Sequence, residues 1–373
     1  VYKRQEMAFH KVCDDDPAGI TAAILEAKAA GCELIFTTGG MSVDPDDRTP
    51  LAIKNTGADI ITYGATINSI LVPDRDGKFA DVLVGFDTVE GHEKYSDYEG
   101  MTVGRYANRL ANGSFTIDGV KYEVEKNENG VTCLHGGAEL SHAVWKPLIV
   151  DDNCLEMSYH SPDGAMGFPG NVDFKVTFTL FEDNSLKIDY YAVSDKKTVI
   201  NMTNHAYFNL AGEGDILGHE LMINADAFTP TDERSIPTGE IRPVEGTAFD
   251  FRQPKLIGRD IAQDDPQLIK DRGYDHNFCL NEGDGPAAAA YDPSSGRQLE
   301  VFTDLCGVQL YTGNFLDGTK PGKQGKPLIK HAGFCLETQF YPNTPNMPEF
   351  PQCTVDAGES FRSTTVFKFS VRK

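Results

Sequence analysis

The hydrophobic pattern of the chain changes character near residue 60. From Ile60 onward, apolar and polar residues alternate with a period of two, which is typical of β-strands. The expected strands, each beside a turn signal, cover residues 60–72, 114–117, 174–181, 186–193 and 363–371. Past residue 60 the only candidate helix is a short one over residues 256–261. The pattern predicts an all-β domain of roughly 300 residues, arranged as a large sandwich rather than as βαβ units.

The first part of the chain has a different pattern. Asp16 can cap a helix that has Pro17 at its first position, and apolar residues then repeat at helical spacing as far as Gly31. Residues 34–38 follow as a short buried strand, and Gly39-Gly40 form a loop at its carboxyl end. The pattern predicts a short α/β stub, preceded by a disordered leader over residues 1–11.

One strand carries a carboxylate in an unusual place. Over residues 334–340, Leu336 and Thr338 share one face, while Cys335, Glu337 and Gln339 share the other. Glu337 therefore sits among apolar residues, where carboxylates are usually avoided, although a solvated strand face would also explain it. His205 lies in a second unusual run, of polar and aromatic residues, over residues 203–210. An acid and a base on separate strands are what a proton-shuttling site needs.

Several short segments place polar groups where alternation predicts core. They include Gly104 to Arg109 with Asn108, the run Cys133 to Gly137 with His135, residues 273–277 with Asp275, and Gln309 within residues 308–314. A single histidine or arginine pair is more often structural than catalytic, so each segment alone is a weak signal. His276, Arg105 and Trp145, the one tryptophan, are expected to be structural.

Composition excludes several classes of function. The net charge is −22, which argues against nucleic acid or an anionic membrane as a partner. The chain has no apolar run of 18 residues and no secretory leader pattern. Its eight cysteines form no CxxC motif, which is typical of reduced thiols in a cytoplasmic protein. No metal-binding spacing and no nucleotide-binding glycine motif is present, so we expect neither metal nor cofactor.

Eight motifs together resemble the aldose 1-epimerase family, also called the galactose mutarotases. They run from about Tyr63 to Phe369 in the family order, and they read GRYANR, LHGG, SPDGAMGFPG, TNHAYFNL, IPTG, DHNF, VQLYTGN and ETQFYPN. The resemblance implies a galactose mutarotase-like antiparallel β-supersandwich, which agrees with the strand pattern. It also implies interconversion of the α and β anomers of free aldohexoses such as galactose and glucose.

The resemblance assigns roles to particular residues. Glu337 matches the base that removes the proton of the C1 hydroxyl, and His205 the acid that protonates the ring oxygen. A neighbouring carboxylate could hold His205 protonated at neutral pH. Arg109, His135 and Asp275 match hydroxyl-binding residues, and Asn108 and Gln309 match further sugar contacts. The expected partner is a small sugar, bound by a monomer or a homodimer.

The N-terminal part resembles a second family. The string TTGGMSVDPDDRTPLAI, with Asp15 to Pro17, resembles the molybdopterin-binding domain of molybdenum-cofactor biosynthesis proteins. We therefore divide the chain into residues 1–11, a partial α/β fragment over residues 12–62 and the epimerase domain over residues 63–373. Our hypothesis is a fusion joined near Thr62 to Ala65, which would leave the epimerase domain without its first strand and with an exposed sheet edge or core layer.

Other functions stay open at this point. A hexose-6-phosphate 1-epimerase would need extra basic groups near C6 of the sugar. A non-catalytic carbohydrate-binding module would keep the sugar contacts without turnover. A glycosidase would need two carboxylates across the bond, for which Glu337 and Asp275 could serve. Molybdopterin binding would need the rest of that domain.

Overall fold

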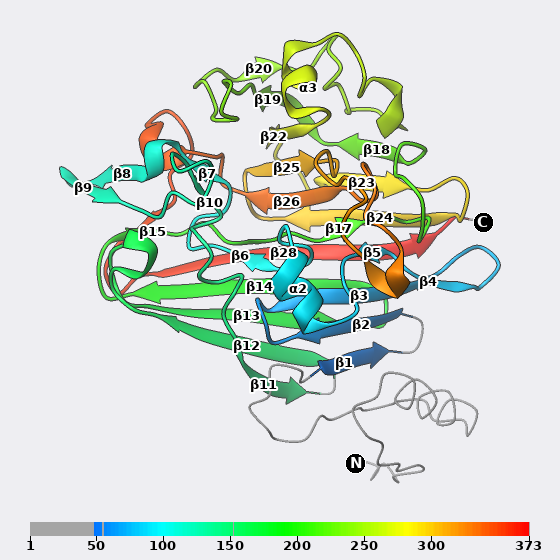
Figure 1. The fold of residues 1–373 in the computed structure, drawn as a ribbon, viewed down its shortest axis with the longest axis horizontal. Coiled ribbons are helices and arrows are strands. Elements are labelled where there is room, and N and C mark those ends of the chain that lie inside the picture. The colour runs from blue at the N-terminus through cyan, green and yellow to red at the C-terminus, as the bar shows by residue number, and fades with distance from the viewer. Residues whose placement is uncertain (1–47, 54–55, 152, 373) are drawn as a thin grey trace.

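A computed structural model describes residues 48–53, 56–151 and 153–372 of the chain (Figure 1). The predicted leader, and the predicted helix, strand and glycine loop between residues 14 and 40, lie outside the described residues. The division of the chain at residues 12 and 63 stays a prediction.

A nine-stranded antiparallel sheet forms the largest layer of the molecule (Figure 1). In spatial order its strands are β11 (Lys146–Asp151), β12 (Cys154–Ser161), β13 (Val172–Leu180), β14 (Ser185–Ser194), β28 (Ser360–Val371), β24 (Arg297–Thr303), β23 (Ala288–Tyr291), β18 (Glu220–Ile223) and β21 (Lys255–Leu256). The strands expected over residues 174–181, 186–193 and 363–371 correspond to β13, β14 and β28. Their alternating burial explains why the period-two pattern found them.

A five-stranded antiparallel sheet lies beyond β28 in Figure 1 and carries three of the predicted site residues, Asp275, Gln309 and Glu337. Its strands, in spatial order, are β20 (Arg242–Pro243), β19 (Ala225–Thr229), β22 (Asp275–Leu280), β25 (Gly307–Tyr311) and β26 (Cys335–Gln339). All five residues of β26 are buried. The strand expected around Glu337 is therefore confirmed, and the alternative of a solvated face for Glu337 is wrong.

A third sheet has four strands, namely β1 (Arg48–Ile53), β2 (Thr56–Ile61), β3 (Thr66–Pro73) and β4 (Phe79–Asp81). Ala58 and Ile60 of β2 belong to the main hydrophobic core, although they precede the predicted boundary at residue 63. Strand β3 is paired on both sides, by β2 and by β4. Residues of the predicted stub thus cover β3 where the fusion hypothesis expected an exposed layer.

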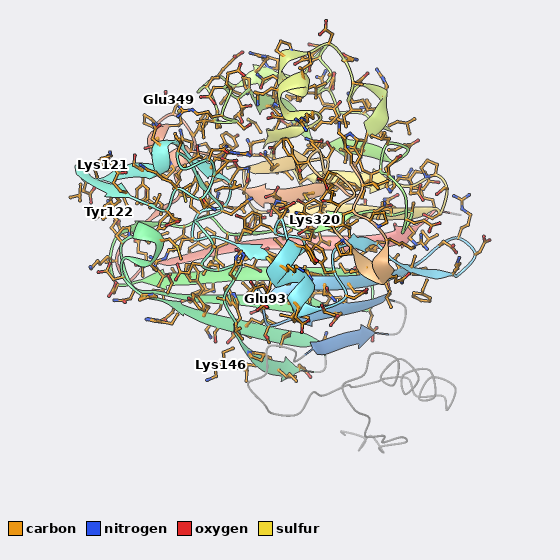
Figure 2. The ribbon with its side chains drawn as sticks, viewed as in Figure 1. Glu93, Lys121, Tyr122, Lys146, Lys320 and Glu349 are labelled. Carbon is orange, nitrogen blue, oxygen red and sulfur yellow. The ribbon has the colours of Figure 1, made fainter. Side chains whose placement is uncertain are left out.

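Short strand pairs complete the β structure of the described residues. They are β5 (Leu83–Val84) with β17 (Tyr207–Phe208), β6 (Thr102–Val103) with β16 (Thr203–Asn204), β7 (Arg109–Leu110) with β10 (Cys133–Leu134), β8 (Ser114–Ile117) with β9 (Val120–Glu123), and β15 (Thr198–Val199) with β27 (Thr354–Val355). The β8–β9 hairpin projects from one end of the molecule, where Figure 2 labels Lys121 and Tyr122. Three of these pairs, β7–β10, β6–β16 and β5–β17, contain or flank Arg109, His135 and His205.

Helices are few in the described part of the chain. Helix α2 (Val89–Tyr95) is capped by Thr88, whose hydroxyl accepts a hydrogen bond from Gly91 N, and α3 (Pro266–Asp271) is capped by Asp265. The helix expected over residues 256–261 is wrong, because β21 ends at Leu256 and only one 3-10 turn (Ile257–Arg259) follows. No helix among the described residues is long and apolar enough to cross a bilayer.

One hydrophobic core connects the sheets. It contains inward residues of β13 and β14, such as Phe174 and Ile188, and also Phe334 and Leu336 at β26. Strands dominate the described residues, so the predicted all-β sandwich is confirmed. The polar residues of interest lie at the edge of this core, on β22, β25 and β26 and on the loops beside them.

Candidate active site

Three adjacent strands of the five-stranded sheet carry polar side chains that lie side by side. Asp275 opens β22, Gln309 lies in β25, and Glu337 lies opposite Gln309 in β26. All three side chains are buried, and only 2% of Glu337 is exposed. The pattern of residues 334–340 had placed Glu337 on one face with Cys335 and Gln339, and the pairing of β26 with β25 puts that face beside Gln309.

His205 faces Glu337 from the loop between β16 and β17. Its Nε2 lies 3.5 Å from Oε1 of Glu337. The backbone holds the loop firmly, because His205 N donates to the carbonyl of Met101 at 2.9 Å and His205 O accepts from Gly100 N at 3.0 Å. The structure thus brings together the two residues that sequence reasoning named as base and acid.

His135 lies next to His205, with 5.1 Å between the ring centroids. Its backbone is left-handed (φ 53°), and its amide donates to the carbonyl of Asn108 at 3.0 Å. Its Nδ1 accepts a hydrogen bond from Asn108 N at 3.2 Å. A neutral His135 ring must therefore carry its proton on Nε2, which makes it a hydrogen-bond donor on the side away from Asn108.

Two carboxylates hold Arg109. Nε and Nη2 donate to Glu128 at 3.0 to 3.1 Å, and Nη1 donates to Asp275 at 3.4 Å. Burial lowers the pKa of the guanidinium, but the charges of Asp275 and Glu128 outweigh it and leave the pKa above its ordinary value. Arg109 therefore stays charged, and its planar fork is fixed in one direction. Asn108 supports the same turn, since its Oδ1 accepts from Arg109 N at 2.8 Å.

A chain of amide hydrogen bonds fixes Asp275 and Gln309. Nε2 of Gln309 donates to Oδ1 of Asp275 at 2.6 Å, and Oε1 of Gln309 accepts from Gln339 at 3.2 Å. Gln339 also donates to Asn277 at 3.1 Å. Oε2 of Glu337, by contrast, is buried and has no hydrogen-bond partner in the structure. The row is thus ordered by its own bonds, while Glu337 keeps an acceptor free.

Burial has the largest influence on the pKa values of Glu337, His205 and His135. It raises the pKa of Glu337 well above 4.5; Asp275 adds to this shift and Arg109 opposes it. Burial also lowers the pKa of His205 to about 4 and that of His135 well below 6.5. Burial thus works against the expectation that a neighbouring carboxylate holds His205 protonated, because it disfavours the imidazolium.

One group of described residues brings possible metal ligands together. The ligand atoms of His135, His205 and Glu337 lie within 4.8 Å of one another. A metal would need the lone pair of His135 Nε2, but that nitrogen carries the proton when Nδ1 accepts from Asn108. The group therefore fits hydrogen bonding better than metal binding, and the absence of a metal stays a prediction.

The three residues expected to be structural are buried, and each is held by hydrogen bonds of its own. Arg105 is fully buried and donates to Ser161 and to the carbonyls of Pro162, Pro169 and Gly170. His276 accepts from Asp275 N and faces Gln267. The indole of Trp145 donates to Leu140 O at 2.9 Å. These contacts confirm a structural place for all three.

Sequence reasoning missed several residues beside the site. The ring of Tyr98 lies 4.6 Å from that of His135 and 5.9 Å from that of His205, and Tyr207 lies 5.1 Å from His205. Glu128 fixes Arg109, as described above. Tyr207 belongs to the motif around His205, which could have pointed to it, whereas Tyr98 and Glu128 lie in polar turns that carry no periodic signal.

Asn127 and Glu128 link the arginine to the histidine loop. Asn127 accepts from Leu134 N at 2.8 Å and donates to Leu134 O at 2.9 Å, so it clamps the residue before His135. Glu128 bonds Arg109 at the same time. One short turn therefore holds two of the predicted sugar contacts in register.

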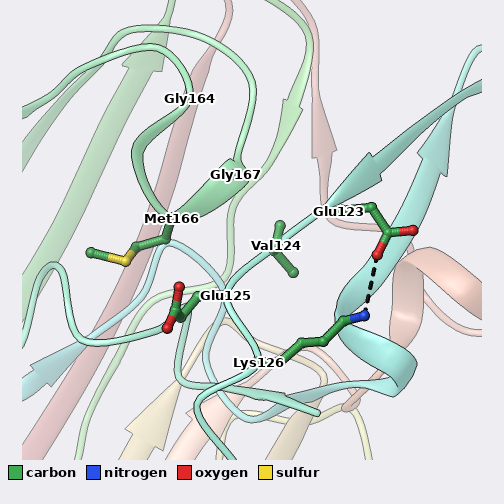
Figure 3. A pocket seen from close by; sticks show the side chains of 7 residues that line it. All are labelled: Glu123, Val124, Glu125, Lys126, Gly164, Met166 and Gly167. Atoms are coloured by element: carbon green, nitrogen blue, oxygen red, sulfur yellow. Dashed lines mark ion pairs between the residues drawn. The ribbon is translucent and has the colours of Figure 1, made fainter. Parts of the chain in front are cut away.

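A separate surface hollow of about 500 Å³ lies beside this turn (Figure 3). Figure 3 shows an ion pair between Lys126 and Glu123, 3.4 Å apart, on one side and Met166 on the other. The hollow is lined by Glu123, Val124, Glu125, Lys126, Gly164, Met166 and Gly167, and by none of the predicted site residues. It is therefore distinct from the cluster around Glu337.

Fold and site together define an acid/base enzyme built on a β-sandwich, with groups suited to a polyhydroxylated ligand. The aldose 1-epimerase family model matches residues 51–368, and a probable molybdopterin binding domain matches residues 3–77. The chain belongs to the aldose 1-epimerase family and is an isomerase-type enzyme. Both predicted resemblances are thus confirmed, and the two matches overlap over residues 51–77.

Individual relatives agree with this assignment. The galactose mutarotase of Rattus norvegicus is 45% identical over 339 residues, which cover 90% of this chain and 96% of the relative. The aldose 1-epimerase of Escherichia coli is 38% identical and covers 90% of this chain and 99% of its own length. Among solved structures, an aldose epimerase homologue from C. elegans superposes with a TM-score of 0.82 at 30% identity, covering 88% of this chain and all of its own.

A galactose 1-epimerase from Lactobacillus acidophilus superposes with a TM-score of 0.79 at 29% identity. It covers 91% of this chain and 99% of its own. The fold is therefore shared along nearly the full length of both solved relatives.

Proposed function

We propose that this enzyme interconverts the α and β anomers of free aldohexoses, galactose and glucose among them, with Glu337 as base and His205 as acid. The observation that carries the proposal is the buried approach of His205 Nε2 to Glu337 Oε1, at 3.5 Å, beside a row of hydroxyl-binding groups. The names of the relatives, galactose mutarotase and aldose 1-epimerase, point to the same sugars.

The proposed reaction begins when Glu337 removes the proton of the C1 hydroxyl. The C1–O5 bond breaks, and Nε2–H of His205 protonates the ring oxygen. Rotation about C1–C2 turns the aldehyde over, and the reverse transfers close the ring on the other face. Burial raises the pKa of Glu337 and lowers that of His205, so the ionised base is strong and the protonated acid is strong.

The other site residues are proposed to hold the sugar. Arg109 and the Nε2–H of His135 can donate to hydroxyl oxygens, and Asp275 can accept from hydroxyl protons. Gln309 and Asn108 supply further amide contacts. Asp275 and Gln309 are bonded to each other, so the sugar meets groups whose directions are already fixed.

A free sugar fits this site better than a hexose 6-phosphate. The charge of Arg109 is already matched by Glu128 and Asp275, so it offers no unpaired cation to a phosphate. Arg105 is buried and bonded to Ser161 and backbone carbonyls, so it cannot reach a ligand at the site. The observed ion pairs therefore favour a neutral sugar.

We also propose a cytoplasmic location and a monomer or homodimer. The cysteines of the described residues are all free, which supports a reducing compartment. Size-exclusion chromatography with light scattering would measure the oligomeric state directly.

Polarimetry tests the proposed reaction. Fresh α-D-galactose and α-D-glucose should mutarotate faster with the purified enzyme than in buffer. The Glu337→Gln substitution should lower the enzymatic rate by about 100- to 10,000-fold. Sugar binding by Glu337→Gln, followed by calorimetry, should persist. A wild-type enzyme that binds sugar without any acceleration would instead establish a carbohydrate-binding module.

A further inference from the structure

Beside the proposed site, the sheet face that carries Glu337 continues as a layer of buried amides. Gln339 follows Glu337 by two residues in β26, so both side chains leave the same face of the strand. Gln309 of β25 lies opposite Glu337, and Asn277 of β22 lies opposite Gln309. Gln339 is fully buried and Asn277 is 1% exposed. Both amides therefore depend on hydrogen-bond partners inside the protein.

A glycine in β25 leaves the room that this layer needs. Gly307 lies opposite Gln339, two residues before Gln309. A Cβ atom at Gly307 would lie 2.5 Å from Oδ1 of Asn277 and 3.1 Å from the backbone oxygen of Gln339. Any side chain at this position would displace Asn277, so the close approach of the amides requires glycine.

The direction of each amide follows from Asp275. The carboxylate of Asp275 pairs with Arg109 and can only accept, so the atom of Gln309 that lies 2.6 Å away is its nitrogen. Oε1 of Gln309 then needs a donor, which is Nε2 of Gln339 at 3.2 Å. The same nitrogen donates to Oδ1 of Asn277 at 3.1 Å. A chain of donors thus runs from Gln339 through Gln309 to the carboxylate.

This direction leaves two atoms of the layer unpaired. Nδ2 of Asn277 and Oε1 of Gln339 are buried without a hydrogen-bond partner in the structure. If both amides were reversed, Asn277 could donate to Gln339, but Oε1 of Gln339 would then face Oε1 of Gln309, with two acceptors opposed. The layer is therefore directed by Gln309 and Asp275, and not by the pairing of Asn277 with Gln339.

We propose that Gln339 is a positioning residue that binds the carbonyl of the Gln309 amide and so holds the NH2 group of Gln309 at the sugar. One hydrogen of that group goes to Asp275, and the second donates to a hydroxyl oxygen of the aldohexose. This inference rests on the proposed function, in which Gln309 contacts the sugar. A donor at Gln309 and an acceptor at Asp275 then lie side by side, which suits two neighbouring hydroxyl groups.

Gln339 holds the amide of Gln309 from the end that Asp275 does not hold. A sugar hydroxyl that donates to Asp275 competes with Gln309 for the same carboxylate. The bond from Gln339 is then what keeps the carbonyl of Gln309 turned away from the sugar. Without Gln339 that carbonyl is a buried acceptor without a donor, and the amide gains by turning toward the hydroxyl groups.

Neutron diffraction of the wild-type enzyme tests the direction of the amides. Crystals exchanged into heavy water, with and without galactose, should show deuterium on the atom of Gln309 that faces Asp275. They should also show deuterium on the atom of Gln339 that faces Gln309. A Gln309 carbonyl that faces Asp275 or the sugar would overturn the proposal, and this measurement needs no variant to fold.

A variant of Gln339 connects this direction to sugar binding. Gln339→Met keeps the length of the side chain and removes its hydrogen bonds. It should raise KM and the calorimetric Kd for galactose by about 3- to 10-fold, the effect of one neutral hydrogen bond, with kcat nearly unchanged. In a Gln309→Ala background, Gln339→Met should raise KM no further, because Gln339 acts through Gln309. An equal rise in that background would overturn the proposal.

Thr338→Val is the matched control for a general loosening of β26. Thr338 is 1% exposed, lies next to Gln339 on the other face of the strand, and forms a hydrogen bond with Thr365 at 2.5 Å. Its substitution should lower the melting temperature and leave KM unchanged. A rise of KM equal to that of Gln339→Met would show that Gln339 acts only by stabilising the strand.

The outcomes separate this inference from the proposed function. A wild type that binds galactose without turnover would refute the proposed function, and the Kd of Gln339→Met would still test the role of Gln339. An active wild type with an unchanged KM in Gln339→Met would refute the inference alone. A wild type that binds no aldohexose would refute both.

Discussion

Strands β14 and β26 are both central to the core, yet they are built differently. In β14 burial alternates, with Leu186, Ile188 and Tyr190 inside and Lys187 and Asp189 at the partly exposed face, where they pair at 2.8 Å. In β26 every residue is buried, although three of the five are polar. The first arrangement gains stability from the buried face of the strand, and the second buries a carboxyl group at a cost.

The difference between the two strands shows that the residues proposed for catalysis lie where burial lowers the stability of the fold. A charged pair at a partly exposed face is solvated and contributes little either way. The carboxyl group of Glu337 is not solvated in this way, because its Oε2 is buried and has no hydrogen-bond partner. That free acceptor is what a base needs when a sugar hydroxyl arrives. The nine-stranded sheet is thus the scaffold, and the five-stranded sheet carries the proposed base, Glu337.

The most direct test of this comparison is to remove the proposed acid and the proposed base together. Glu337→Gln and His205→Ala should each lower kcat by about 100- to 10,000-fold, and the double variant should be little worse than the more severe single one. The reason is that an acid and a base that act in one step fail as a unit. Polarimetric rates of the four proteins complete the cycle.

Glu300→Gln in β24 is the matched control for that experiment. Glu300 is a partly exposed carboxylate of the nine-stranded sheet, opposite Lys368 of β28. Its rate should equal that of the wild type. Fully additive losses in the double variant would contradict a shared proton-transfer step.

A second variant probes the support of the site rather than its reactive groups. Glu128→Gln should raise KM for galactose by about 10- to 100-fold, because a charged hydrogen bond to Arg109 contributes about 1.5 to 3 kcal/mol. The value of kcat should change much less, since Glu128 contacts Arg109 and not the proposed acid or base. Initial rates over a range of sugar concentrations separate the two constants.

The neighbouring Glu123→Gln serves as the control for Glu128. Glu123 is exposed and pairs with Lys121 and Lys126, so its loss should leave both constants unchanged. A Glu128→Gln variant that loses kcat and keeps KM would show that Arg109 acts on the chemical step.

The smallest expected effect concerns the pH dependence of stability. Because burial raises the pKa of Glu337 in the folded state, its contribution to stability is complete below the unfolded pKa of about 4.3 and is lost as the pH rises through the folded value. Glu337→Gln should therefore be more stable than the wild type at neutral pH, by about 1 to 3 kcal/mol, the usual cost of a buried unsatisfied group.

Thermal unfolding at several pH values measures this difference. The advantage of Glu337→Gln should shrink as the pH falls toward 4. Glu300→Gln, whose carboxylate is partly solvated, should show no such trend. An advantage of Glu337→Gln that is constant with pH would mean that packing, and not ionisation, causes it.

Much of the scaffold and of the site could be predicted from the sequence. Strands β13, β14 and β28 alternate because one face is buried, and that alternation is visible in the residues themselves. Glu337 and His205 stood out because polar groups interrupt an apolar pattern. Their roles came from the family motifs, and only the folded chain shows them 3.5 Å apart.

Other features left little or no trace in the sequence. Helix α3 begins with Asp265-Pro266, the same signature that was read at Asp16-Pro17, but its six residues are too few to show helical periodicity. Cys335 and His205 are 130 residues apart, so no local pattern could join them. The lowered pKa of His205 depends on burial by the complete fold, which the neighbours of His205 in the sequence do not reveal.

The place of β28 in the nine-stranded sheet has a consequence for how the chain is made. This strand joins β14 on one side and β24 on the other, yet it comes after all the other strands of the sheet in the sequence. A ribosome therefore releases two half-sheets with facing open edges before it releases the strand that closes them. Open edges of this kind pair with other chains, so the nascent protein is most vulnerable to aggregation just before synthesis reaches β28.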